Sequence, residues 1–243
     1  MDETKIILSR LEDLADRRDK HSYCVFSKFL TPAEQQMVIR FKNKALWGGF
    51  EEAERKMAVF YPDFTDKEEI YWDIELIRAA TTDSAEYTHR DWLGSLLGLG
   101  IKREVLGDIL IEGSTAYIFC MGAIADYIAE NLASVARSCV KTEKIEIDED
   151  IIPKKRYEEI TGSVQAPRLD SITAVITGKS RTTASSVVTS GNVRVNFTEN
   201  TNTSYTLKEN DILSVRGYGK FVYDGVSHIS KKGRSIIKLR KYI

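Results

Sequence analysis

The chain has 243 residues, of which 42% are hydrophobic and 29% charged, which is typical of a soluble globular protein with two or three modest domains. No apolar run approaches the roughly 20 residues that span a bilayer, and the charged start MDETKIILSR does not resemble a signal peptide. Cys24, Cys120 and Cys139 are far apart and form no C-x-x-C pair. We therefore expect no disulfide, no metal site and a cytoplasmic location.

The net charge of −1 conceals an asymmetry between the two parts of the chain. Residues 151–243 hold 16 Lys and Arg against 7 Asp and Glu, a net charge of +9, and residues 1–150 hold a net charge of −10. A basic segment of this kind favours binding to a polyanion, and a solvated basic surface is the alternative.

Residues 1–66 are expected to form an N-terminal helical domain. The apolar spacing of its first segment predicts one helix, and Thr31-Pro32-Ala33-Glu34 supplies the start signals of a second. Apolar residues continue that second pattern to Leu46, and Glu51 to Phe60 is expected to form a third helix.

Residues 67–150 are expected to form a central domain with the order β-α-β-β-α-β. Strands are expected near residues 70–80, 109–111, 116–121 and 140–147, and helices near residues 88–99 and 124–135. This is the ferredoxin-like or RRM-like arrangement, which many unrelated proteins use. The charged residues that follow predict a linker over 151–166, and the basic part then occupies 167–243.

The segment from Thr177 to Asn196, TGKSRTTASSVVTSGNVRVN, begins with the letters that end a nucleotide-phosphate loop. Such a loop needs a glycine five residues before Gly178, where this chain has Thr173, and it must follow a strand, whereas residues 170–176 predict a helix. The segment instead predicts a helix with Ser180 as N-cap, ended by Gly191. Its exposed face would carry Arg181 and short hydroxyl side chains, so a polyanion could approach the free amides closely.

Taken in order, these residues resemble an S4-type RNA-binding domain over about residues 167–228. Arg168-Leu169-Asp170 opens one helix, Ser180-Arg181 opens the next, and Gly191-Asn192-Val193-Arg194-Val195-Asn196 forms the following turn and strand. Asn196-Phe197 stands where the family has an Asn-Gly turn. The resemblance implies a small α/β domain with the αL motif, so the expected fold class of the chain is α+β.

Further motifs extend the resemblance to nearly the whole chain, which is similar to the YlmH family. They are Gly48-Gly49-Phe50-Glu51-Glu52-Ala53-Glu54-Arg55, His89 to Glu104 (HRDWLGSLLGLGIKRE), Gly107-Asp108-Ile109 and Ser214 to Phe221 (SVRGYGKF). The resemblance implies a ribosome-associated RNA-binding protein encoded near bacterial cell-division genes. It also implies a role in quality control of large ribosomal subunits that hold an obstructed peptidyl-tRNA.

We expect RNA to contact the basic domain mainly through shape and charge. The expected contacts are Arg168, Lys179, Ser180, Arg181, Thr182, Ser185, Arg194, Asn196, Arg216 and Lys220. In the central domain, His89, Arg90, Lys102 and Arg103 are candidate contacts to RNA or to a ribosomal protein. The basic tail from His228 to Ile243 is expected to form a strand, which either adds to the RNA surface or is a solubilising edge strand.

An RNA-reading RRM should present aromatic residues on a middle strand. Here Tyr117 and Phe119 are the candidates, without the Arg-Gly start of that motif, and core packing is the better interpretation.

His89-Arg90-Asp91 imitates a kinase catalytic loop, but Leu96 occupies the position of the required Asn.

We therefore predict a non-catalytic protein without cofactor, metal or small-molecule substrate. Its predicted partners are RNA, namely rRNA and tRNA on the large ribosomal subunit, and it is expected to be a monomer without membrane association. Two alternatives stay open: a protein-interaction adaptor in cell division, and an accessory of an RNA-modifying enzyme.

Overall fold

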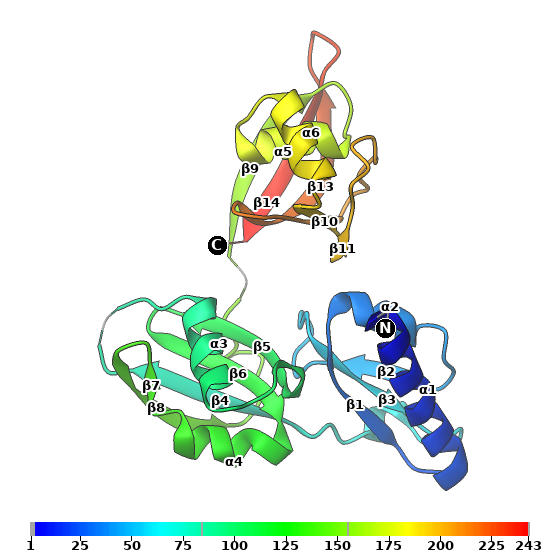
Figure 1. The fold of residues 1–243 in the computed structure, drawn as a ribbon, viewed down its shortest axis with the longest axis vertical. Helices are drawn as coiled ribbons and strands as arrows, with labels where there is room; N and C mark the ends of the chain where they lie inside the picture. Colours follow the sequence, from blue (N-terminus) through cyan, green and yellow to red (C-terminus); the bar gives the residue numbers. More distant parts are fainter. Residues whose placement is uncertain (1–2, 84, 155, 243) are drawn as a thin grey trace. The chain divides into compact units, whose positions relative to one another are not determined.

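The computed structural model describes residues 3–83, 85–154 and 156–242. The chain divides into two compact units, Met1–Pro153 and Lys154–Ile243 (Figure 1). The expected N-terminal and central domains thus lie together in the first unit. In the described parts of the chain, no helix is long and apolar enough to cross a membrane.

The first unit begins with a small α/β layer instead of the expected helical domain. Its elements are α1 (Glu3–His21), β1 (Val25–Leu30), α2 (Pro32–Val38), β2 (Lys44–Trp47) and β3 (Lys56–Phe60), and the sheet order is β1-β3-β2. The predicted start of α2 is confirmed, because Thr31 and Glu34 form a capping box.

The expectation that the second helix continues to Leu46 and that Glu51 to Phe60 form a third helix is wrong. Helix α2 ends at Val38, and Lys44–Trp47 and Lys56–Phe60 are both strands. Glu, Ala, Lys and Met favour a helix locally, but β3 is the middle strand of its sheet and Met57–Phe60 are fully buried. A strand covered on both faces is continuously apolar, so tertiary packing overrides the local propensity here.

The central part of the first unit has the predicted β-α-β-β-α-β order with one additional strand, β7 (Ser134–Val135), because the second helix ends at Asn131 and the residues expected as its end pair with the last strand. Its elements are η1 (Lys67–Glu69), β4 (Ile74–Thr81), α3 (His89–Gly98), η2 (Arg103–Val105), β5 (Leu106–Glu112), β6 (Thr115–Met121), α4 (Gly122–Asn131), β7 (Ser134–Val135) and β8 (Ser138–Ile145). The sheet order is β5-β6-β4-β8-β7. Helices α3 and α4 pack on one face of this sheet through Trp92, Leu96, Ala125 and Ile128.

The other face of this sheet is buried under the N-terminal layer. Phe119 lies 4.9 Å from Phe50, measured between ring centroids, within a core cluster that also contains Phe29 and Met57. The close approach requires glycine at two positions: a Cβ at Gly49 would lie 2.6 Å from the Phe119 ring, and one at Gly107 would lie 2.8 Å from Phe29. This shared core makes one unit of the two parts.

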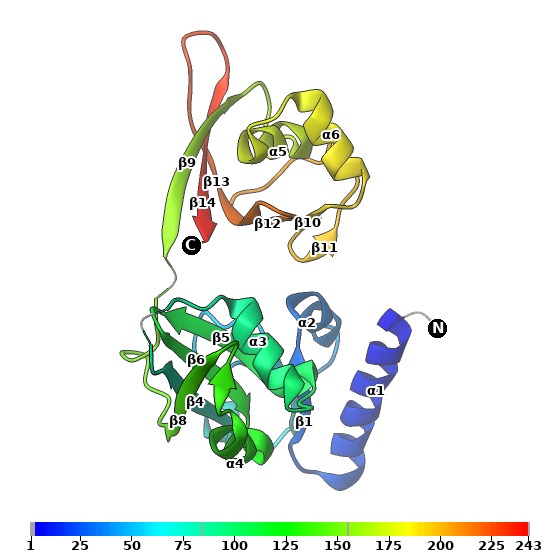
Figure 2. The same cartoon turned by 60° about the vertical axis from the view of Figure 1, so that its left-hand side comes forward.

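The second unit is one six-stranded antiparallel sheet with two helices on one face (Figures 1 and 2). Its elements are β9 (Tyr157–Val164), α5 (Leu169–Thr177), α6 (Arg181–Thr189), β10 (Val193–Val195), β11 (Thr198–Glu199), β12 (Ile212–Val215), β13 (Gly219–Ile229) and β14 (Ser235–Tyr242). The sheet order is β11-β10-β12-β13-β14-β9. Helices α5 and α6, both predicted, pack through Leu169, Ile172 and Val188 onto the core residues of the strands.

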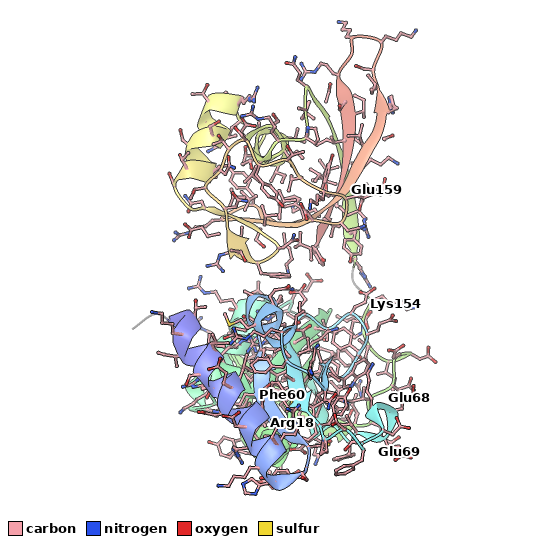
Figure 3. All side chains as sticks on the ribbon, turned by 90° about the vertical axis from the view of Figure 1, so that its right-hand side faces the viewer. Arg18, Phe60, Glu68, Glu69, Lys154 and Glu159 are labelled. Carbon is pink, nitrogen blue, oxygen red and sulfur yellow. The ribbon has the colours of Figure 1, made fainter. Side chains whose placement is uncertain are left out.

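One expectation about this unit is wrong, and one of the two alternatives for the basic tail is excluded. The residues expected as a linker contain β9, an edge strand that carries Glu159 (Figure 3) and pairs with β14 along its whole length. An edge strand with one exposed face has the charged composition of a linker, so composition alone does not distinguish the two. Conversely, β14 is not an edge strand, because it lies between β13 and β9 with Ile237 and Leu239 fully buried.

Candidate nucleic-acid interface

The corner between α5 and α6 forms for local reasons that the sequence contains. Gly178 adopts the left-handed conformation (φ 65°) and ends α5, and Ser180 begins α6 by accepting a hydrogen bond from the Thr183 amide over 3.2 Å. In the described parts of the chain, the amides of Arg181 and Thr182 have no acceptor. These amides at the positive end of the helix dipole favour an anion.

Asp170 fixes the two arginines at this corner. Its side chain is only 5% exposed, and Oδ2 accepts a hydrogen bond from Nε of Arg181 over 2.9 Å. Nε of Arg168 lies 3.5 Å from Oδ1, and the same guanidinium donates to Ser204 over 2.6 Å. Arg181 remains 52% exposed, so the pair orients its guanidinium without removing it from solvent.

The pKa of Asp170 reflects this arrangement. Burial on its own raises the pKa of this carboxyl, but the hydrogen bond and charge of Arg181, the Ser171 amide and the charge of Arg168 outweigh burial and lower it below its ordinary value. Asp170 is therefore ionised at neutral pH and keeps both arginines in place.

The ten expected RNA contacts divide between two faces of the second unit. Residues of one group lie around the α5–α6 corner and on α6: Arg168, Lys179, Ser180, Arg181, Thr182 and Ser185. Arg216 belongs to the β12–β13 turn, whose Tyr218 ring centroid lies 5.9 Å from Nζ of Lys179. Arg194 and Lys220 alternate with core residues of their strands, so they point to the sheet face opposite the helices.

Asn196 has a structural task. Its Nδ2 donates to Oδ1 of buried Asp211 over 2.8 Å, and its Oδ1 accepts from the Ile212 amide over 2.9 Å. Asn196 and Phe197 both have positive φ, 48° and 68°, and link β10 to β11 as a two-residue turn. The turn expected for Asn-Gly thus forms with Phe at the second position, where a large side chain is strained.

Phe197 and Lys220 contact each other on the sheet face opposite the helices. Nζ of Lys220 lies 4.9 Å from the Phe197 ring centroid and 5.2 Å from that of Tyr242. Tyr242 in turn packs against Tyr157, with ring centroids 5.0 Å apart. This cation–aromatic group orders Lys220 in a setting different from the α5–α6 corner.

The expected contacts in the first unit also differ among themselves. His89 and Arg90 lie exposed at the start of α3, and Lys102 lies exposed just before η2. Arg103 is directed inward instead: its Nη1 donates to the carbonyls of Leu106 and Gly107, each over 2.9 Å. Burial and the neighbouring charge of Arg55 lower the pKa of Arg103 to about 10, with Asp108 acting in the opposite direction.

Arg55 and Asp108 explain why Arg103 is held there. Asp108 accepts hydrogen bonds from the amides of Glu54 and Arg55 over 2.6 and 3.0 Å, and Arg55 donates to the carbonyls of Leu106 and Phe29. The Gly-Gly-Phe and Gly-Asp motifs of the sequence thus join the N-terminal layer to the central sheet. The sequence alone does not indicate this structural role.

The sheet face on which an RRM stacks bases is not available in the first unit. Tyr117 is 8% exposed and Phe119 is fully buried. Both lie in the core shared with the N-terminal layer. The interpretation of these aromatic residues as core is confirmed.

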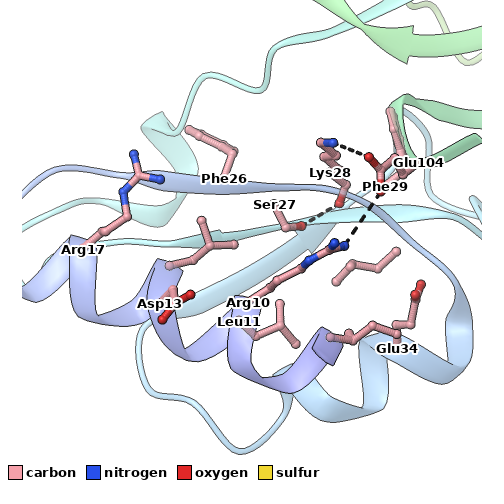
Figure 4. Close-up of a pocket in the computed structure, with 13 residues that line it drawn as sticks. Arg10, Leu11, Asp13, Arg17, Phe26, Ser27, Lys28, Phe29, Glu34 and Glu104 are labelled. Carbon is pink, nitrogen blue, oxygen red and sulfur yellow. Dashed lines mark hydrogen bonds and ion pairs between the residues drawn. The ribbon is translucent and has the colours of Figure 1, made fainter. Parts of the chain in front are cut away.

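A hollow of about 370 Å³ lies between α1 and β1 in the same unit (Figure 4). Leu11 and Phe29 contribute apolar surface to it. Charged residues form its rim, where Glu104 pairs with Lys28 and lies 4.0 Å from Arg10.

In the parts of the chain that the structure describes, no group of three His, Cys, Asp or Glu could hold a metal ion.

Three comparisons identify the chain's relatives. A family model described as "Putative RNA-binding domain in YlmH" matches residues 72–149. The ribosome-associated protein quality control protein P2 of Bacillus subtilis (strain 168) is 30% identical over 212 residues, which cover 85% of this chain and 82% of that protein. The solved structure of the cell division protein ylmH from Streptococcus pneumoniae matches with a TM-score of 0.56 at 20% identity, covering 63% of this chain and 96% of that one.

The structural match shows a common fold. The family model marks residues 72–149 as a putative RNA-binding domain, so the class of protein that the comparisons support is that of RNA-binding proteins. The similarity to the Bacillus protein covers 85% of the chain, so the family relationship holds for most of its length. The chain belongs to the YlmH family.

Proposed function

We propose that this chain is a non-catalytic RNA-binding protein that associates with the ribosome in the cytoplasm. The observation that carries the proposal is the α5–α6 corner, where buried Asp170 orients Arg168 and Arg181 beside the free amides at the start of α6. Phosphate oxygens are the natural acceptors for such donors. The +9 net charge of the segment that contains the corner supports a polyanion as the partner.

The second unit would act as an S4-type RNA-binding domain, with α5 and α6 against the RNA backbone. The exposed hydroxyl groups of α6 support this assignment, because short side chains let a backbone approach closely. The printed name of the Bacillus relative supports a role in ribosome-associated quality control. We propose ribosomal RNA and tRNA on the large subunit as the bound species, with a monomer as the acting form.

The family model's RNA-binding label falls on the central part of the chain, whose stacking face is buried. RNA contact there would have to use another surface. The exposed cations Arg90, Lys102, Arg137 and Lys141 are the candidates. Such contacts would add affinity by charge and not by reading bases.

Co-sedimentation of the intact chain with ribosomes, before and after nuclease treatment, tests the proposal. We expect the chain to sediment with large subunits and to be released by nuclease or high salt. Sequencing of RNA crosslinked to the protein in cells should yield rRNA and tRNA. Partners that persist after nuclease treatment would instead support a protein adaptor acting through the acidic first unit.

A further inference from the structure

The second unit contains a pocket of about 540 Å³ that the helix corner shares with a distant part of the chain. Its walls come from the α5–α6 turn with Lys179 and Arg181, from the end of β9 with Ser163, and from Arg234 in the turn between β13 and β14. Three cations from two separate chain segments thus line one hollow.

Backbone contacts build this pocket and hold Arg234 at it. Gly162 of β9 permits α5 to lie directly on the sheet, because a Cβ there would be 2.5 Å from a methyl group of Val175, which lines the pocket. Nη2 of Arg234 donates to the Ser163 carbonyl over 2.7 Å. The turn is itself fixed, since the Ser230 amide donates to the Arg234 carbonyl over 2.7 Å.

The charges in the pocket favour an anion. No carboxylate lines it, and in the described parts of the chain neither Lys179 nor Arg234 has a carboxylate within ion-pair distance. Arg181 uses Nε for Asp170. Like charges that share a hollow repel one another, so an anion placed among them is stabilised by all three. The planar forks of the two arginines match the geometry of phosphate oxygens.

We propose that this pocket binds one backbone phosphate of the RNA, and that Arg234 is a contact residue of the interface. The proposal rests on the proposed function and extends it beyond the helix pair to the β13–β14 turn. The volume of about 540 Å³ exceeds that of a lone phosphate group. The contact adds affinity without sequence preference, because a phosphate carries no base identity.

The salt dependence of RNA binding by the intact chain tests this directly. The probe is a fluorescein-labelled 20-base-pair RNA duplex, and its Kd is measured by anisotropy from 50 to 200 mM KCl. Each neutralised phosphate contributes roughly one unit to the slope of log K against log salt. We expect Arg234→Gln to weaken binding and to reduce that slope by about one. Lys238→Gln is the matched control, since Lys238 is exposed on the opposite sheet face and its removal should leave the slope unchanged.

A second variant protects the test against loss of folding. Lys179→Gln removes a cation from the other wall of the pocket without touching the β13–β14 turn, and should reduce the slope by a similar amount. Wild-type slopes in both Arg234→Gln and Lys179→Gln would overturn the pocket proposal alone. If the wild-type chain itself binds the duplex without salt dependence, the proposed function fails together with it.

Discussion

Nε of Arg181 donates to Oδ2 of Asp170 over 2.9 Å, joining an exposed cation at the start of α6 to a buried carboxylate at the start of α5. The pair links the starts of the two helices and fixes the direction of the guanidinium. A side chain held in this way loses little conformational entropy on binding, which favours affinity. Stability and RNA binding are therefore coupled at this carboxylate.

Asp170→Asn should make the second unit less sensitive to acid. The folded-state pKa of Asp170 is lowered, so its contribution to stability is present above the unfolded value of about 4 and is lost as pH falls through the lower folded value. We expect the free energy of unfolding to fall less steeply in the variant as the pH drops below about 4. At pH 7 the variant should be less stable by about 2 kcal/mol, because it loses the ion pair with Arg181. The loss is smaller than for a fully buried pair, since Arg181 is half exposed.

Urea unfolding followed by far-UV circular dichroism measures both effects. All three tryptophans, Trp47, Trp72 and Trp92, belong to the first unit, so their fluorescence follows that unit alone. The fluorescence transition should be unchanged in Asp170→Asn. An identical pH profile in variant and wild type would contradict the ion-pair account.

Asn196→Ala should reduce stability and not merely RNA affinity. The substitution removes two hydrogen bonds, one of them to buried Asp211, and places alanine at φ 48°. We expect a loss of about 2 to 3 kcal/mol in the circular-dichroism transition of the second unit. Arg194→Gln, two residues earlier and exposed, should change stability by less than about 0.5 kcal/mol. Equal stability of the two variants would contradict the structural role of Asn196 and favour its role as an RNA contact.

Gly49→Ala should destabilise the first unit strongly. Its Cβ would lie 2.6 Å from the Phe119 ring at a backbone φ of 98°, so packing and conformation both oppose alanine. We expect a loss of about 3 kcal/mol in urea unfolding monitored by tryptophan fluorescence.

Gly94→Ala provides the control for that measurement. This glycine lies in α3, and apart from its chain neighbours and the backbone of its own helix, no atom of the described residues lies within 4 Å of an added Cβ. Alanine there should stabilise the unit by about 0.5 to 1 kcal/mol through helix propensity. Similar transitions for Gly49→Ala and wild type would mean that the N-terminal layer does not press on the central sheet as described.

Cys120 should resist thiol reagents at pH 8. Burial, followed by the charge of Glu75, raises the pKa of its thiol to about 12, so almost no thiolate is present. Ellman's reagent should modify exposed Cys139 rapidly and Cys120 only after denaturation. Cys139→Ser should remove the fast phase. A rapid reaction of Cys120 in the folded chain would contradict the closed core around β6.

Local signals in the sequence were sufficient for the elements that end or begin sharply. The caps at Thr31 and Ser180 predicted the starts of α2 and α6 correctly. The same reasoning failed for β3 and β9. Strand β3 is buried on both faces, so it lacks the alternation of apolar and polar residues that marks a strand, and its residue types favour a helix. Strand β9 is an edge strand with one exposed face, so its composition is that of a linker.

Only the part of the candidate site that depends on local signals could be predicted from the sequence. Arg168 and Arg181 follow from helix starts, which are local, whereas the division of the expected contacts over two sheet faces depends on strand register. The inward direction of Arg103 depends on contacts with residues about fifty positions away. Arg234 reaches the pocket through the pairing of β14 with β9, and its sequence neighbourhood indicated only a basic tail.

The most direct test of the central claim is ultraviolet crosslinking in cells, followed by mass spectrometry of the RNA-linked peptides of this chain. Crosslinks should be concentrated at the α5–α6 corner and the adjoining pocket, within residues 168–185 and at the β13–β14 turn. Crosslinks confined to residues 72–149, with none in the second unit, would contradict the claim.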